Sequence, residues 1–158
     1  MNITVVCVGK IKEKFFTDAI SEYLKRLSRF AKTSVIEVRD EKIPENASLK
    51  ECELVLEKEA ESILSKIPKN SYVVTLCIEG DQLSSPALAD KIKYLSMEHS
   101  HITFIIGGSL GLHNKVKELS GLRLSFGKIT LPHQLMRVVL LEQIYRSFKI
   151  LSNESYHK

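Results

Sequence analysis

Glycines that could hold a ligand are concentrated in the last third of this 158-residue chain. Residues 107–112 read GGSLGL and directly follow the strand-like residues 103–106. Glycine lets the backbone approach a ligand closely, and ligands of open α/β sheets bind beyond the carboxyl ends of the strands. The run has neither the GxGxxG spacing of a dinucleotide-binding loop nor the GKS or GKT of a P-loop. It predicts either a small-molecule loop or a tight turn without a ligand.

A histidine, two arginines and an aromatic tail follow this loop. His133 begins the last helix after Pro132, where it could move a proton near neutral pH or pack structurally. Arg137 and Arg146 interrupt an apolar helix, and arginine suits phosphate binding and base stacking. The final residues 156–158 combine an aromatic ring, an imidazole and a cation, which could hold RNA. The alternative for this tail is a frayed terminus.

Carboxylates also follow the strand that ends near Leu76. Glu79 and Asp81 flank Gly80 directly beyond this strand. Side chains at such a position could take part in chemistry, but glycine and aspartate are also common in solvated turns. Both interpretations stay open from the sequence.

The elements that must position these residues alternate between strands and helices. Apolar runs predict strands at residues 3–8, 34–38, 72–78, 102–106 and 122–126. Helical spacing and start signals predict helices at residues 13–29 and 48–66, from Ser84 onward, and at residues 113–119 and 133–151. Continuously apolar strands separated by helices predict an α/β fold, with a mostly parallel sheet flanked by helices. We expect one domain over residues 1–158.

The amino-acid composition limits the classes of protein to which this chain can belong. The apolar content of 44% can build a core, and no apolar run is long enough for a membrane span. Residues 1–8 predict a strand rather than a signal peptide. Cys7, Cys52 and Cys77 are scattered and lack CxxC spacing, so we expect reduced thiols in a cytoplasmic protein and no structural metal site.

Positive charge is concentrated in the same third of the chain as the glycines. Residues 107–158 contain eight lysines or arginines and three glutamates, whereas residues 1–106 contain fifteen basic and sixteen acidic side chains. This asymmetry indicates an anionic partner such as nucleic acid. The last helix is apolar over most of its circumference, which predicts either a homodimer contact or a central core helix.

These segments together resemble the ribosomal RNA large subunit methyltransferase H family, of the SPOUT class of methyltransferases. The resemblance rests on GGxxGL within residues 105–112 and on TLPHxLxR within residues 129–138. It covers essentially the whole chain. The other matching segments are residues 8–10, 74–76, 142–150 and 156–158.

The resemblance implies a SPOUT α/β-knot with a C-terminal trefoil knot, an exception to the rule that chains are unknotted. It implies a homodimer without a metal, with S-adenosylmethionine (SAM) held in the knot. The implied reaction is SAM-dependent methylation of N3 of pseudouridine 1915 in 23S rRNA, on assembled ribosomes. Alternatives are a ribosome-binding factor without catalysis, and a SPOUT methyltransferase acting on another RNA base.

Site residues follow by carrying the family's motifs onto this sequence. The implied SAM contacts are Leu76, Gly107, Phe126, Gly127, Lys128, Ile129, Thr130 and Leu131. The residues expected to face the nucleotide are His133, Arg137, Tyr156 and His157, with the tail coming from the same or the other subunit. Methyl transfer from a sulfonium is mainly a matter of positioning, and loss of the N3 proton needs a base or a cationic environment.

Overall fold

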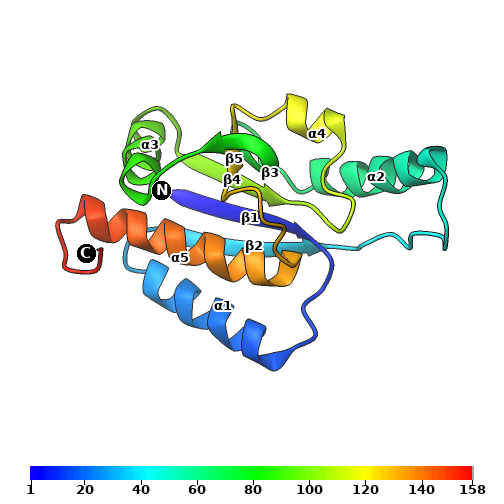
Figure 1. Cartoon of the computed structure of the whole chain (residues 1–158). Coiled ribbons are helices and arrows are strands. Elements are labelled where there is room, and N and C mark those ends of the chain that lie inside the picture. Colours follow the sequence, from blue (N-terminus) through cyan, green and yellow to red (C-terminus); the bar gives the residue numbers. More distant parts are fainter. Residues whose placement is uncertain (158) are drawn as a thin grey trace.

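The computed structural model describes residues 1–157 and shows the expected alternation of strands and helices (Figure 1). The strands are β1 (Asn2–Val8), β2 (Lys32–Val38), β3 (Tyr72–Gln82), β4 (His101–Ile106) and β5 (Leu122–Ser125). The helices are α1 (Lys14–Leu27), α2 (Leu49–Leu64), α3 (Ser85–Glu98), α4 (Asn114–Glu118) and α5 (His133–Leu151). All strand pairs are parallel, in the order β2-β1-β4-β3-β5. The predicted α/β fold with a mostly parallel sheet is confirmed.

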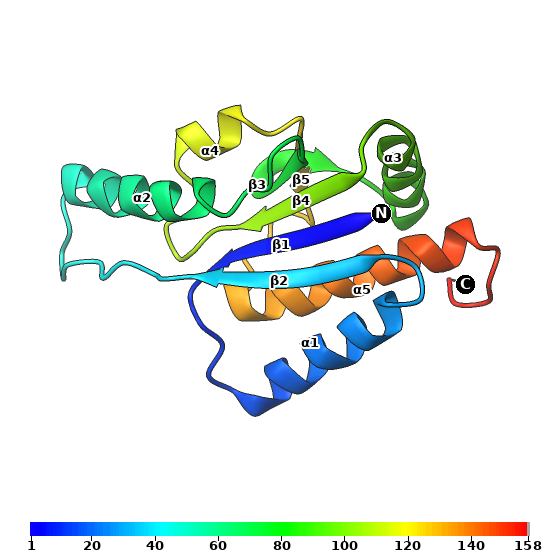
Figure 2. The ribbon, with the colours of Figure 1, turned by 180° about the vertical axis from the view of Figure 1, so that it is seen from behind.

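Helices cover both faces of the sheet (Figures 1 and 2). Strand β1 shows why: Val5 and Cys7 pack with α1, α3 and α5, whereas Val6 and Val8 pack with α2 and α4. Side chains alternate between the two faces of a strand, so both sets must be apolar. This explains why the strands read as continuous apolar runs.

Helix α5 lies between α1 and α3 on one face of the sheet (Figure 1). Leu140, Leu141 and Ile144 are fully buried there. Leu135 and Val139, on the outer side of the helix, are only partly buried. The helix is therefore part of the core, and its first half keeps partly exposed apolar side chains on the outer side. Among residues 1–157, no helix has the length and apolar character that a membrane crossing requires.

Strand β3 is longer than expected. The residues 79–81, which could have been a turn, continue the strand to Gln82 through an irregularity in its pairing. Leu124 of β5 pairs with both Leu76 and Asp81, so β3 bulges between these two residues. A side chain at Gly80 would lie 2.6 Å from the carbonyl oxygen of Arg123, so the close approach of the two strands requires glycine.

Candidate active site

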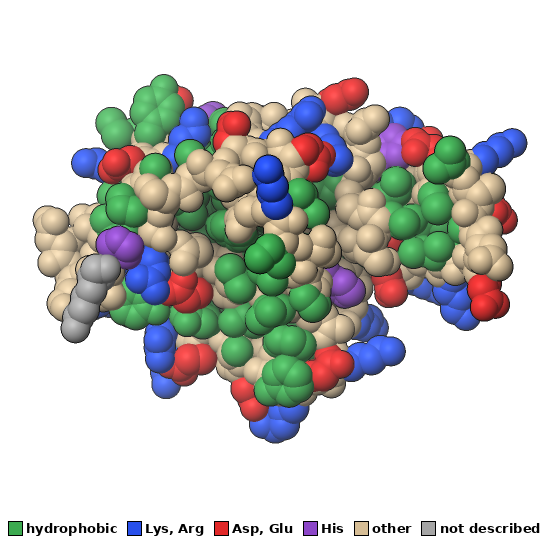
Figure 3. Space-filling view, viewed as in Figure 1, with side chains coloured by type: hydrophobic (Ala, Val, Ile, Leu, Met, Phe, Trp, Pro, Cys, Tyr) green, Lys and Arg blue, Asp and Glu red, His purple; other side chains and the backbone are tan. Residues whose placement is uncertain are grey.

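A cavity of about 650 Å³ lies beside the bulged segment of β3 and beyond the carboxyl ends of β4 and β5. Its walls are residues 76–79 of β3, the loop after β4 and the loop between β5 and α5, and the first turn of α5 closes it. Figure 3 shows hydrophobic side chains gathered over the middle of this face of the molecule. A cavity of this size at this edge is typical of a small-molecule site in an α/β fold.

The structure brings together nearly all the residues expected to contact the cofactor. Lys128 is the exception, because its side chain is exposed and does not line the cavity, although its neighbours on both sides do. The expected residues that line the cavity are Leu76, Gly107, Phe126, Gly127, Ile129, Thr130 and Leu131.

The glycine-rich loop is both a tight turn and a wall of the cavity. The N–H of Gly111 donates to the carbonyl oxygen of Gly108 at 3.0 Å, and Gly111 has a φ of 82°. A side chain at Gly107 would lie 2.4 Å from the carbonyl oxygen of Gly111. No larger residue fits at Gly107 unless the loop moves, so the backbone itself forms the wall.

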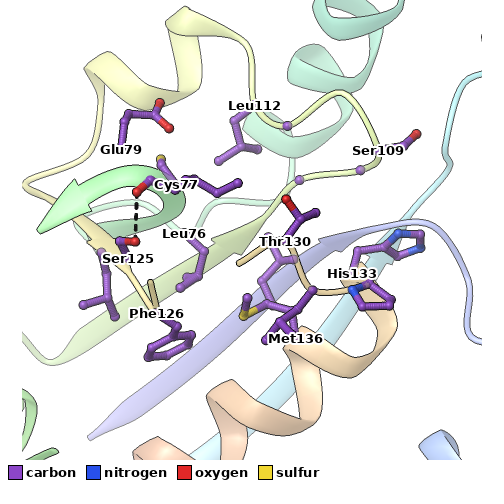
Figure 4. Close-up of a pocket in the computed structure, with 18 of the residues that line it drawn as sticks. Leu76, Cys77, Glu79, Ser109, Leu112, Ser125, Phe126, Thr130, His133 and Met136 are labelled. Atoms are coloured by element: carbon purple, nitrogen blue, oxygen red, sulfur yellow. Dashed lines mark hydrogen bonds between the residues drawn. The ribbon is translucent and has the colours of Figure 1, made fainter. Parts of the chain in front are cut away.

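The loop after β5 is held in place by Ser125. Its hydroxyl donates to the carbonyl oxygen of Ile78 at 2.9 Å (Figure 4). It also accepts from the N–H of Gly127 at 3.1 Å. Gly127 has a φ of 118°, a conformation that favours glycine. Ser125 was not predicted as a site residue. The signal that could have found it is a serine at a strand end, two residues before a glycine.

Apolar side chains supply much of the cavity surface. Leu76, Leu112, Phe126 and Met136 reach it from four different elements or loops (Figure 4). Such walls suit a flat or apolar part of a ligand. Leu112 belongs to the loop 107–112 that the sequence offered as a small-molecule loop, whereas Met136 was not predicted as a site residue, because a methionine in an apolar helix looks like any core residue.

Glu79 lies at one side of the cavity, away from His133 (Figure 4), and forms an ion pair with Lys117, which also lines the cavity. Lys117 Nζ is 2.5 Å from Glu79 Oε1, and this hydrogen bond lowers the pKa of Glu79. Glu79 therefore stays ionised near neutral pH. Its charge is compensated by Lys117, which does not favour an acid–base role.

His133 lines the opposite side and is half-buried. It packs against the loop after β1, where a side chain at Gly9 would lie 3.2 Å from His133 Nε2. Burial lowers the pKa of His133, and the positive charge of Arg137 lowers it further. The imidazole is therefore neutral near pH 7 and can accept a proton.

Arg137 occupies a different position from the one expected. It has no exposed surface and does not line the cavity. Its guanidinium donates to the carbonyl oxygens of Val8 and Gly9 at 2.9 and 2.6 Å, and to Glu37 Oε1 at 2.8 Å. The end of β1 needs donors for its carbonyls, and Arg137 supplies them, so the guanidinium faces β1 instead of a nucleotide.

Tyr156 packs against the later turns of α5 in the same chain. Its ring contacts Tyr145, with centroids 5.1 Å apart, and its hydroxyl donates to Glu142 Oε1 at 3.2 Å. Burial is the first cause that raises the pKa of Tyr156 to about 12, so the phenol stays protonated. Arg146, which packs over the ring, is about 20 Å along the helix from His133, at 1.5 Å per residue. Within this chain, Tyr156 therefore lies away from the cavity.

His157 is exposed beside Arg146, with His157 Nδ1 3.3 Å from Arg146 Nη1. An arginine can only donate, so Nδ1 accepts in this contact. With Nδ1 as the acceptor, the other ring nitrogen, Nε2, is the donor of His157. Lys158, the last residue of the tail, lies outside the described residues.

No group of three or more potential metal ligands occurs within residues 1–157. Cys77 lines the cavity, and burial raises the pKa of its thiol. It is therefore a protonated wall residue near neutral pH and not a nucleophile.

Comparison with known proteins identifies the family. A family model described as "Predicted SPOUT methyltransferase" matches residues 1–157. The chain belongs to the SPOUT methyltransferase family. Curated proteins named "Ribosomal RNA large subunit methyltransferase H" are similar over the full length of both chains. They come from Bifidobacterium animalis subsp. lactis (57% identical), Lactobacillus helveticus (57%) and Streptococcus uberis (55%).

A solved structure is similar to this fold at low sequence identity. It is described as a probable methylase family protein from Haemophilus influenzae Rd KW20, with a TM-score of 0.55 and 14% identity. The likeness covers 99% of this chain and 70% of the other, and it concerns the fold alone. The C-terminal trefoil knot of this SPOUT methyltransferase stays a prediction.

Proposed function

We propose that this protein transfers a methyl group from SAM to N3 of pseudouridine 1915 in 23S rRNA, on assembled ribosomes. The observation that carries the proposal is the cavity, which gathers seven of the eight expected cofactor residues in one place. The names of the full-length relatives support the RNA substrate.

The cavity suits SAM in size and in chemistry. Its volume of about 650 Å³ is within the range of small-molecule sites. Leu76, Phe126 and Met136 offer apolar surface for the adenine, and the loops at Gly107 and Gly127 bring backbone groups close to the ligand. Bound SAM supplies an activated methyl group on a sulfonium, which needs no metal.

The residues of this chain then have to orient the nucleotide and remove its N3 proton. His133 is at the side of the cavity nearest β1 and is neutral, so we assign it the acceptor role. His157, held by Arg146, presents a donor and suits a hydrogen bond to a base carbonyl or phosphate. Arg137 acts indirectly, by fixing the end of β1 against which His133 packs.

A homodimer would complete this site. The cavity and the tail are at different positions along α5 in one protomer, whereas both are expected to face the nucleotide. The partly buried outer stripe of α5, including Leu135 and Val139, offers an apolar surface for a second copy. A tail from the second copy would then lie at the cavity of the first. Analytical ultracentrifugation tests this: a monomer at assay concentration would contradict it.

Methyl transfer to ribosomes tests the proposed function. Ribosomes from a strain that lacks this enzyme are incubated with the protein and methyl-labelled SAM, and the label is counted in 23S rRNA. We expect about one methyl group per large subunit, with SAM binding measured separately by calorimetry. Saturable ribosome binding without label would favour a factor without catalysis. Label in a different nucleotide would favour another RNA base.

A further inference from the structure

The chain leaves α5 through a turn of fixed geometry. Asn153 has a left-handed backbone conformation with a φ of 52°. Its N–H donates to the carbonyl oxygen of Ile150, and the N–H of Glu154 donates to that of Lys149, both at 3.0 Å. With Ser152 as the C-cap, these two hydrogen bonds form a Schellman motif. The motif sets the direction in which residues 154–157 leave the helix.

The side chain of Glu154 connects this turn to the turn between α1 and β2 through an ion pair. Its carboxylate pairs with Lys149 of α5 and with Arg29 in the turn between α1 and β2, where Arg29 Nη2 is 2.9 Å from Glu154 Oε1. That turn is itself packed on α5, because the ring of Phe30 stacks on Phe148 with centroids 5.5 Å apart. The hydrogen bond from Lys149 lowers the pKa of Glu154, so its carboxylate is ionised near neutral pH.

The tip of the tail is held by a second set of contacts. The ring of Tyr156 lies between Tyr145 and the guanidinium of Arg146, whose Cζ is 4.7 Å from the ring centroid. Arg146 is in turn fixed by Glu142, at 2.5 Å. Tyr156 thus anchors the tail on its own helix, and the exposed His157 takes a defined position beside it.

We propose that the turn at Asn153 and the ion pairs of Glu154 are positioning elements that present His157 to the RNA. Neither Asn153 nor Glu154 needs to contact the substrate, since each acts by fixing the position of the residues that follow it. Positioning of this kind matters because a displacement of about 1 Å at a reacting group can cost a large factor in rate. The inference rests on the proposed methylation of ribosomes and adds two residues that the cavity does not contain.

Three full-length variants test this inference. Asn153→Val places a β-branched residue where φ is positive, which valine strongly disfavours. Asn153→Gly is the matched control, because glycine accepts this conformation freely. Glu154→Gln keeps the size of the side chain and removes the charge that pairs with Arg29 and Lys149.

The readouts are kcat and KM for ribosomes at saturating SAM, the Kd for SAM, and the melting temperature. We expect Asn153→Val to lower kcat/KM for ribosomes about tenfold. Asn153→Gly should stay within about twofold of wild type, and Glu154→Gln should fall between the two. All three should bind SAM like wild type and remain folded at the assay temperature.

The outcomes separate this inference from the proposed function. Wild-type rates for Asn153→Val and Glu154→Gln would overturn the inference alone. Equal losses in Asn153→Val and Asn153→Gly, or losses that follow SAM affinity, would also overturn it, because left-handed geometry would then not be the cause. A wild-type protein that binds SAM but leaves ribosomes unmethylated would overturn the proposed function, and the inference with it.

Discussion

Replacing Arg137 by methionine should destabilise the protein strongly. The guanidinium is fully buried and makes hydrogen bonds to Val8, Gly9 and Glu37, at 2.9, 2.6 and 2.8 Å. Methionine keeps much of the side-chain length but offers no donor. The carbonyls of Val8 and Gly9 would lose this donor in a buried region, and the partly exposed Glu37 would lose its ion pair.

The size of the effect follows from this burial. Removing one partner of a buried, hydrogen-bonded ion pair costs about 3–5 kcal/mol of unfolding free energy. For a domain of this length, each kcal/mol lowers the melting temperature by about 2–4 °C. We therefore expect Arg137→Met to melt about 10 °C below wild type.

Glu37→Gln is the matched control for Arg137→Met. Its side chain is 34% exposed, and this change leaves the bonds from Arg137 to Val8 and Gly9 intact. The expected loss is about 1 kcal/mol. Thermal unfolding followed by circular dichroism measures both variants. Arg137→Met as stable as wild type but inactive on ribosomes would refute the reasoning, because Arg137 would then act on the nucleotide directly.

Three further predictions concern the cavity and the buried charges. Gly107→Ala should weaken SAM binding at least about tenfold in calorimetry, because the alanine side chain would lie 2.4 Å from a backbone oxygen. The control Ser96→Ala, at an exposed position, should leave SAM binding unchanged. Equal SAM affinities of the two variants would contradict the assigned cavity. Since burial lowers the pKa of His133, kcat should stay constant as the pH falls to about 6.5 and should decline only below that pH. A decline in kcat that begins near pH 8 would exclude His133 as the proton acceptor. Glu59 is buried, and desolvation is the first cause that raises its pKa, so Glu59→Gln should raise the melting temperature at pH 7.5. That gain should shrink as the pH falls toward 4.5, because protonated Glu59 no longer destabilises the folded state, and a gain independent of pH would contradict this cause.

The fold could be predicted from the sequence because its strands are buried on both faces. Val5 and Val6 pack on opposite faces of the sheet, so both must be apolar. The strands are therefore continuous apolar runs, a pattern that an amphipathic helix does not have. The structure also shows a capping box at Ser48 and Glu51, whose residue types and spacing can be read from the sequence. The extension of β3 past Ile78 was not, because it depends on pairing with β5 across the bulge.

The site was predictable where backbone geometry demands a particular residue. Gly107 and Gly127 stand out in the sequence because only glycine fits their turns. The position of Arg137 was not predictable, since a polar residue in an apolar helix can face either a ligand or a buried carbonyl. Only the packing of α5 against the end of β1 decides between these two.

The most direct test of the central claim is mass spectrometry of nucleotide 1915. Ribosomes from a strain lacking the enzyme are treated with SAM and either the wild-type protein or Gly107→Ala, and the nucleotide is isolated and fragmented. We expect a single added methyl on N3 of the pseudouridine with wild type, and a strong loss with Gly107→Ala. An unmodified nucleotide with wild type, or equal methylation by both proteins, would contradict it.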